Sequence, residues 1–94
     1  MRTKGYVLAP KGIIENRKPI LYMYREEPDN EYDSGWRIFS GDESDEYVNN
    51  PKNIGIYDIV TFMEAYPDIC TYLNYPFGSE LIRESSDYAF REDK

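Results

Sequence analysis

The sequence predicts an α+β domain: a small antiparallel β-sheet with two short helices packed on one face. Three observations predict this class. Apolar residues alternate in short runs over the first 40 residues, recur at helical spacing between Ile56 and Leu73, and alternate weakly again near the end. The chain has 94 residues, the length of one domain, so we expect residues 1–94 to fold as a single unit.

The N-terminal half predicts three strands. Residues 6–9 form a short apolar run that ends at Pro10, whereas residues 13–14 fit either an extended piece or a helical turn. Residues 20–25 and 35–40 alternate and flank a polar loop, so we expect them to pair as an antiparallel hairpin. Both faces of the 20–25 run are partly apolar, which predicts a central strand covered on both sides.

The C-terminal half predicts two helices and a closing hairpin. Apolar residues from Ile56 to Met63 share one helical face, which predicts a helix of about three turns ending before Pro67. Asp68 is placed to cap a second short helix. Two weakly alternating runs within residues 80–91 predict the hairpin.

The composition excludes several classes of function. The chain has no His, so it has no imidazole base and no His-ligated metal. Its one Cys forms no internal disulfide, and we expect Cys70 to be reduced and at least half-buried. A net charge of −7 disfavours binding to nucleic acid or to an anionic membrane. No apolar run has the length of a membrane span or signal peptide, so we expect a cytoplasmic protein.

The negative charge is concentrated in one segment. Between Arg25 and Glu46 there are nine acidic residues and two arginines, so these 22 residues carry the whole net charge of −7. The simplest role for Arg25 and Arg37 is to neutralise acidic neighbours across the strand pair. Charge asymmetry of this kind concerns partners rather than fold.

Aromatic residues are interleaved with these acids, and this composition suits an interface for a basic protein partner. The alternative hypothesis is that these segments are solvated loops that only keep the protein soluble, and the sequence supports the two hypotheses about equally. If the segments form an interface, we expect the surplus negative charge to form one exterior patch to which a cationic partner docks. The predicted partner-binding residues are Asp29, Glu31, Tyr32, Asp33, Trp36, Asp42, Glu43, Asp45, Glu46 and Tyr47.

The acidic residues do not predict a metal site, a cofactor or catalysis. Residues 42–46 supply oxygen ligands, but Tyr47 and Asn53 stand where a calcium-binding EF-hand loop needs glycine and glutamate. With nine acids so close in sequence, some carboxylate pair lies within reach by chance, and a domain this small lacks a deep cleft. We therefore expect no metal, no cofactor and no enzymatic activity.

Three further features carry a family resemblance: the run from Met23 to Asn30, the run from Asp33 to Glu43, and Gly55-Ile56-Tyr57-Asp58 preceded by Asn49 to Pro51. Together they resemble the bacterial immunity protein 33 domain family, first catalogued as a domain of unknown function. The resemblance extends from about Tyr6 through residues 76–79, which is most of the chain.

The resemblance implies a protein that neutralises a cognate bacterial toxin by stoichiometric binding. Many toxin domains are basic nucleases, so an acidic face would steer rapidly to one of them and cover its phosphate-binding surface. The alternative is a stand-alone regulatory or homodimeric binding module with no toxin. The sequence leaves open the oligomeric state and whether the two acidic loops share one face.

Overall fold

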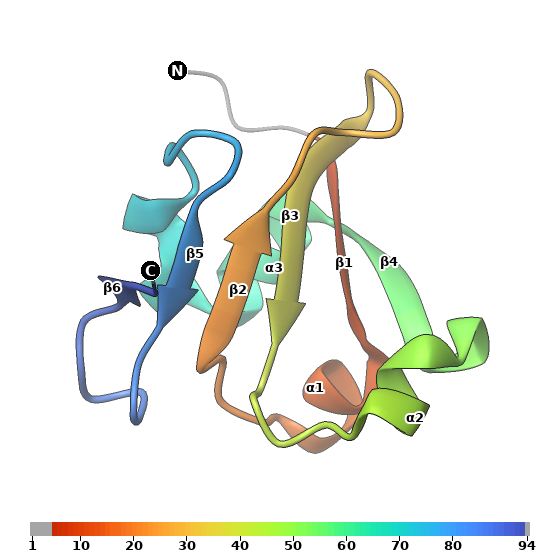
Figure 1. Ribbon diagram of the computed structural model, residues 1–94, viewed down its shortest axis with the longest axis horizontal. Helices are drawn as coiled ribbons and strands as arrows, with labels where there is room; N and C mark the ends of the chain where they lie inside the picture. Colours follow the sequence, from red (N-terminus) through yellow and green to blue (C-terminus); the bar gives the residue numbers. More distant parts are fainter. Residues whose placement is uncertain (1–4, 94) are drawn as a thin grey trace.

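Six strands form one mixed β-sheet in the computed structural model, which describes residues 5–93 (Figure 1). The strand order is β4-β1-β3-β2-β5-β6. The strands are β1 (Tyr6–Pro10), β2 (Tyr22–Arg25), β3 (Asp33–Phe39), β4 (Ile54–Asp58), β5 (Glu80–Ile82) and β6 (Arg91–Glu92). The helices are α1 (Lys11–Asn16), α2 (Asp45–Asn49) and α3 (Ile59–Ala65), with two 3-10 segments, η1 (Pro51–Asn53) and η2 (Pro67–Tyr72).

The α+β class is confirmed, and so are the two predicted hairpins. Strands β2 and β3 pair antiparallel with Met23 opposite Ile38, and β5 pairs with β6 with Ile82 opposite Arg91. The prediction of a purely antiparallel sheet is wrong, because β1 and β3 are parallel. The chain reverses at α1 and again after β2, so β3 runs in the direction of β1 and lies between β1 and β2.

The predicted helix also begins three residues too early, at Ile56 instead of Ile59. Ile56 belongs to β4, which pairs antiparallel with β1 and places Ile56 opposite Leu8. The helix begins at Ile59, because the Asp58 carboxylate caps it by accepting the backbone N–H of Thr61 at 3.1 Å. A residue that fits both the strand period and the helical period takes the strand when an adjacent strand offers pairing.

The second predicted helix is the 3-10 segment η2, and Asp68 does not cap it. Its carboxylate instead pairs with the buried guanidinium of Arg83. Cys70 lies on this segment and is exposed, so the expectation of a buried or half-buried thiol is corrected. The side chains of η2 that reach the core are those of Ile69 and, just after its end, Leu73.

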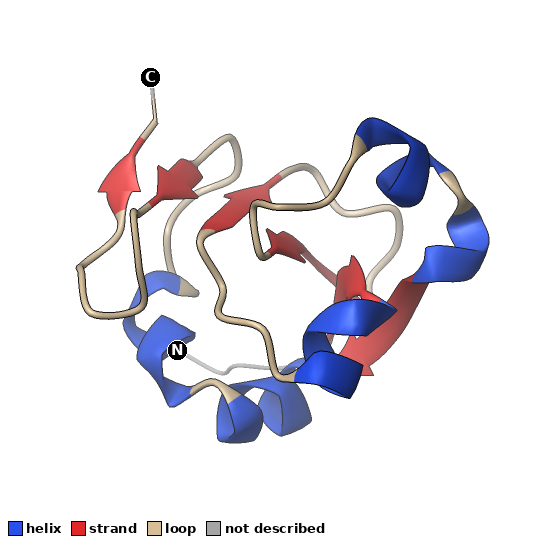
Figure 2. Cartoon of the chain, turned by 90° about the horizontal axis from the view of Figure 1, so that it is seen from below, coloured by secondary structure: helices blue, strands red, loops and turns tan. Residues whose placement is uncertain are grey.

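The two predicted helices, α3 and η2, do pack on one face of the sheet, but the segments α2 and η1, which were not predicted, lie on the other. Segments α1, α3 and η2 contribute Ile13, Phe62 and Ile69 to the core, and in Figure 1 α3 lies behind the sheet. Segments α2 and η1 contain no buried residue and lie on the other side, at the margin of the sheet (Figure 2). The sheet therefore has a covered face and an open face.

The covered face holds the hydrophobic core. Trp36, Ile38 and Met23 project into it and are fully buried. The core cluster consists of Val7, Ala9, Ile13, Ile20, Met23, Trp36, Ile38, Ile59, Phe62, Ile69, Leu73, Leu81 and Phe90. On the open face, Tyr22 and Tyr24 are only half-buried, so the predicted covering of β2 on both sides is not present.

Candidate partner interface

The two acidic loops lie at opposite ends of β3. The first, residues 26–32, joins β2 to β3, whereas the second, residues 40–44, joins β3 to α2, so the whole of β3 separates them (Figure 1). A seven-residue strand is about 20 Å long. The loops therefore do not meet in one patch, although each borders the open face.

At the start of β3, directly after the first loop, Asp33 of the predicted acidic set has a structural role. Asp33 accepts two hydrogen bonds from the Arg37 guanidinium, each of 2.9 Å, and both side chains are almost fully buried. Glu26 accepts a third from Arg37 Nε at 2.6 Å. Hydrogen bonding to Arg37 holds the pKa of Asp33 far below its usual range, and the backbone N–H groups of Asp29 and Gly35 add to this. Asp33 is thus a structural ion-pair residue without exposed contact surface.

Trp36 is likewise placed in the core rather than at a surface. Its exposed fraction is 0%, and its indole Nε1 donates to the carbonyl of Leu73 at 3.1 Å. A partner cannot touch it, so Trp36 is removed from the predicted contact residues. The prediction that Arg37 neutralises acidic neighbours is confirmed. Arg25, in contrast, donates to the carbonyls of Ser34 and Tyr75 and has no carboxylate partner among the described residues.

In the second loop, Asp42 and Glu43 order the turn that follows β3. Glu43 accepts the backbone N–H groups of Ser40 and Gly41, each at 3.0 Å, and the Ser40 hydroxyl at 2.8 Å. The exposed Asp42 shares the single hydrogen of the Ser40 hydroxyl with Glu43, and it forms an ion pair with Lys18 at 3.3 Å. The Ser40 bond, followed by the Lys18 bond, lowers the pKa of Asp42.

Three further members of the predicted set, Asp45, Glu46 and Tyr47, lie on helix α2. Ser44 caps α2 by accepting the N–H of Tyr47, and Asp45 and Glu46 occupy the first turn, where negative charge complements the helix dipole. Both carboxylates are exposed, whereas Tyr47 is half-buried. Of the ten predicted residues, six are exposed, namely Asp29, Glu31, Tyr32, Asp42, Asp45 and Glu46.

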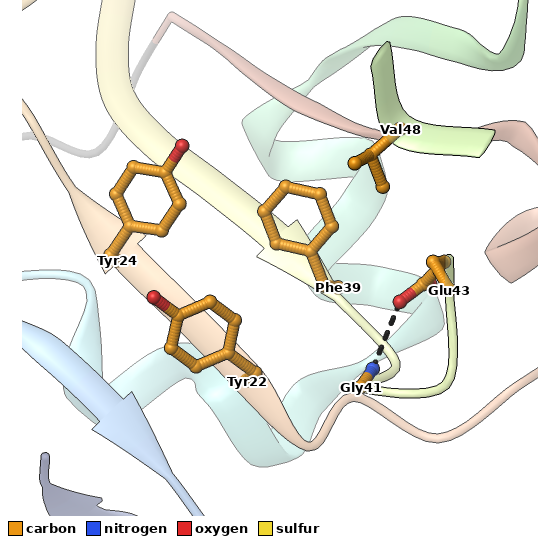
Figure 3. A pocket seen from close by; sticks show the side chains of 6 residues that line it. All are labelled: Tyr22, Tyr24, Phe39, Gly41, Glu43 and Val48. Atoms are coloured by element: carbon orange, nitrogen blue, oxygen red, sulfur yellow. Dashed lines mark hydrogen bonds between the residues drawn. The ribbon is translucent and has the colours of Figure 1, made fainter. Parts of the chain in front are cut away.

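An aromatic groove on the open face was not predicted from the sequence. Tyr22, Tyr24 and Phe39 lie side by side on β2 and β3, and Val48 of α2 and Glu43 close one end (Figure 3). The ring centroids of Tyr24 and Phe39 are 6.0 Å apart with an interplanar angle of 12°. The signal was present as aromatic residues at alternate positions of two strands predicted to pair, but Val48 comes from an element that the pattern did not predict.

The groove consists of two neighbouring hollows whose linings share Tyr24, Phe39 and Val48. The first has a volume of about 220 Å³ and ends at Glu43, and the second has a volume of about 210 Å³ and reaches Glu26. Both are smaller than the roughly 300–1,000 Å³ of typical small-molecule sites. The groove therefore runs along the open face from one acidic loop to the other, and its size suits side chains of a partner.

The charge around the groove is negative. Glu26 and Glu43 line it, and the positive charge of Arg37 is already engaged by Asp33. Glu80 stands opposite Tyr24 on the neighbouring strand. Burial raises the pKa of Tyr24, and the negative charge of Glu26 raises it further. Burial raises the pKa of Tyr22 as well, followed by the charge of Glu80.

Two other kinds of site have no counterpart in the described part of the chain. Residues 5–93 contain no group of three or more Cys, Asp and Glu side chains arranged to hold a metal ion. Within the same residues, every helix is too short or too polar to span a lipid bilayer. An open aromatic groove with a charged rim is typical of surfaces that bind another macromolecule.

The comparison with protein families agrees with this class. The chain belongs to the Imm33 immunity protein domain family, whose model matches residues 7–94, nearly the whole chain. The family implies a role in toxin neutralisation, with a cognate toxin as partner, and its members are typically non-catalytic. No curated protein and no solved structure gives a significant match.

Proposed function

We propose that this protein is a non-catalytic immunity protein that binds a basic cognate toxin stoichiometrically through the open face of its sheet. The observation that carries the proposal is the aromatic groove with an acidic loop at each end. Exposed carboxylates steer a cationic partner toward the surface, and half-buried aromatic rings supply area for tight contact. Loops at opposite ends of β3 would then contact one partner that spans the groove.

Family membership supports the neutralising role, and the charge distribution supports a basic partner. Asp45 and Glu46 at one end and Asp29 and Glu31 at the other are exposed, and among the described residues only Asp29 lies within ion-pair distance of a basic side chain. Asp29 lies 3.9 Å from Arg37, whose charge Asp33 already neutralises; the other three have no such neighbour. These four carboxylates are therefore the most available for a cationic surface.

The test is neutralisation of the toxin identified by pulldown from the native cell. A double variant, Asp45→Lys with Glu46→Lys, is compared with Asp29→Lys and Glu31→Lys, and with a control pair, Glu15→Lys and Glu64→Lys, elsewhere on the molecule. All three pairs change the net charge equally. We expect both loop pairs to slow association and the control to leave it nearly unchanged.

Salt gives a second readout of the same proposal. Exposed charges are screened beyond a Debye length of about 10 Å at 0.1 M salt. The association rate constant of the wild-type protein is expected to fall roughly tenfold or more between low and physiological salt. A rate independent of salt, together with normal neutralisation by both loop pairs, would remove electrostatic steering from the proposal.

A homodimeric or regulatory module is the second candidate, and the edge strand β4 favours it. In the described sheet, β4 pairs only with β1, and its residue Ile56 is 69% exposed. An exposed edge strand is a template for pairing with another strand, including β4 of a second copy. Light scattering after size-exclusion chromatography measures the mass: a monomer that forms a 1:1 toxin complex favours the first candidate, and a stable dimer the second.

A further inference from the structure

We infer that the aromatic groove recognises an arginine side chain of the partner, whose guanidinium packs on Tyr22, Tyr24 and Phe39 beside the carboxylates of the rim. The inference rests on the proposed toxin-binding function and adds which side chain of the toxin the groove binds. It concerns one chemical group in one groove, rather than the general attraction between acidic loops and a basic protein.

The floor of the groove is built for a flat cation. Tyr22, Tyr24 and Phe39 form a triangular cluster, because all three pairs of ring centroids are 5.9–6.0 Å apart. All three are half-buried, so part of each side chain is accessible to a partner. A guanidinium stacks on such rings through its planar, weakly hydrated surface, and its stem packs on apolar side chains such as Val48.

The rim supplies the complementary charge. Glu43 is held at one end by three hydrogen bonds from Ser40 and Gly41, so its carboxylate is preorganised. Glu26 lies at the other end with its side chain 50% exposed. Among residues 5–93, Arg37 is the one basic residue that lines the two hollows, and its single positive charge is shared by the carboxylates of Asp33 and Glu26. The groove therefore favours a cation over a neutral or acidic side chain.

Arginine fits these features better than lysine. The ammonium of lysine is a compact, strongly hydrated point charge, whereas the guanidinium is planar and has five donors. Stacking leaves those donors free at the edge of the plane, directed toward carboxylates around it. A groove with flat rings below and carboxylates at both ends uses both properties.

The test measures side-chain recognition without the toxin. Acetyl-arginine-amide is added to the intact protein, and the ring signals of Tyr22, Tyr24 and Phe39 are followed by NMR. Acetyl-citrulline-amide, which has nearly the same shape without the charge, is the matched probe. The inference predicts saturable shifts of these ring signals with the arginine probe, and weaker binding by about three- to tenfold or more with citrulline.

Two variants locate the binding. Tyr24→Leu removes the ring but keeps an apolar side chain, and it should weaken arginine binding by about three- to tenfold. Tyr88→Leu is the control, because Tyr88 is 58% exposed in the loop between β5 and β6, outside the groove. Fluorescence of the buried Trp36 verifies that each variant is folded.

The outcomes separate this inference from the proposed function. Equal shifts with both probes, no shift at all, or arginine binding unchanged in Tyr24→Leu would overturn the arginine site. A toxin that binds wild type and Tyr24→Leu equally well would also overturn it, while leaving the immunity role in place. Failure of the wild-type protein to bind or neutralise any toxin would instead overturn the proposed function, even where the arginine probe binds.

Discussion

Residues that are neighbours in sequence lie on opposite faces of the sheet and have different roles: those on the covered face form the core, and those on the open face line the groove. On β3, Trp36 and Ile38 project into the covered face and are fully buried, whereas Phe39 projects onto the open face and is half-buried. On β2, Met23 belongs to the core, and Tyr22 and Tyr24 on either side of it line the groove. The comparison indicates that stability resides mainly in the covered face, leaving the open face available for a partner.

The largest difference between the faces is expected from truncating an aromatic residue on each. Trp36→Ala should lower the free energy of unfolding by about 3–5 kcal/mol, because it leaves a cavity and removes the bond to Leu73. This loss is comparable with the whole stability of a small domain. Urea unfolding followed by circular dichroism measures it. A loss below about 1 kcal/mol would break the assignment of stability to the covered face.

The next effect comes from the buried ion pair beneath the groove. Asp33→Asn should cost about 3 kcal/mol at neutral pH, because Arg37 loses its doubly hydrogen-bonded carboxylate. Glu31→Gln, at an exposed position of the loop that precedes β3, is the control and should change stability by no more than about 0.5 kcal/mol. Similar small effects of both variants would show that the pair contributes little.

The same pair predicts how stability depends on pH. The folded-state pKa of Asp33 is lowered by Arg37, so its contribution is present above the unfolded pKa of about 4. That contribution is lost as the pH falls through the folded pKa. The wild-type protein should therefore lose stability steadily below about pH 4, and Asp33→Asn should lose less over the same range. Urea unfolding at several acidic pH values compares the two slopes.

The smallest effect on stability is expected on the open face. Tyr24→Ala removes one half-buried ring and its stacking on Phe39, which should cost about 1 kcal/mol. The same unfolding experiment as for Trp36→Ala makes the two values directly comparable. Equal losses for the two variants would contradict the division between a structural face and a binding face.

Local alternation predicted the parts of the fold that depend on neighbouring strands. The hairpin of β2 and β3 follows from residues close in sequence, whereas the expected covering of β2 on both faces does not hold, because Tyr22 and Tyr24 are only half-buried. The parallel pairing of β1 with β3 was not predicted, because it joins strands separated by α1 and β2 and has no local pattern. Ile56 was misassigned because its spacing fits a helix, although Asp58 carries the capping signal that places the helix start later.

For the candidate site, the sequence identified the acidic residues but not which of them are buried in ion pairs and which are exposed. It could not show that Asp33 is buried against Arg37 while Asp45 stays exposed, because both are acidic residues in polar segments. Alternation along β3 does place Trp36 and Arg37 on opposite faces, but it could not show that the face of Trp36 is the one covered by distant helices. The groove requires three-dimensional placement of α2 over β3.

The most direct test of the central claim is the dissociation constant for the cognate toxin of two variants, Tyr24→Ala and Val60→Ala. Tyr24 lies in the groove, whereas Val60 is 43% exposed on α3, the helix that packs against the other face. We predict that Tyr24→Ala weakens binding by about tenfold or more and that Val60→Ala leaves it unchanged. Unchanged binding by Tyr24→Ala, with a loss for Val60→Ala, would contradict the assignment of the open face as the binding surface.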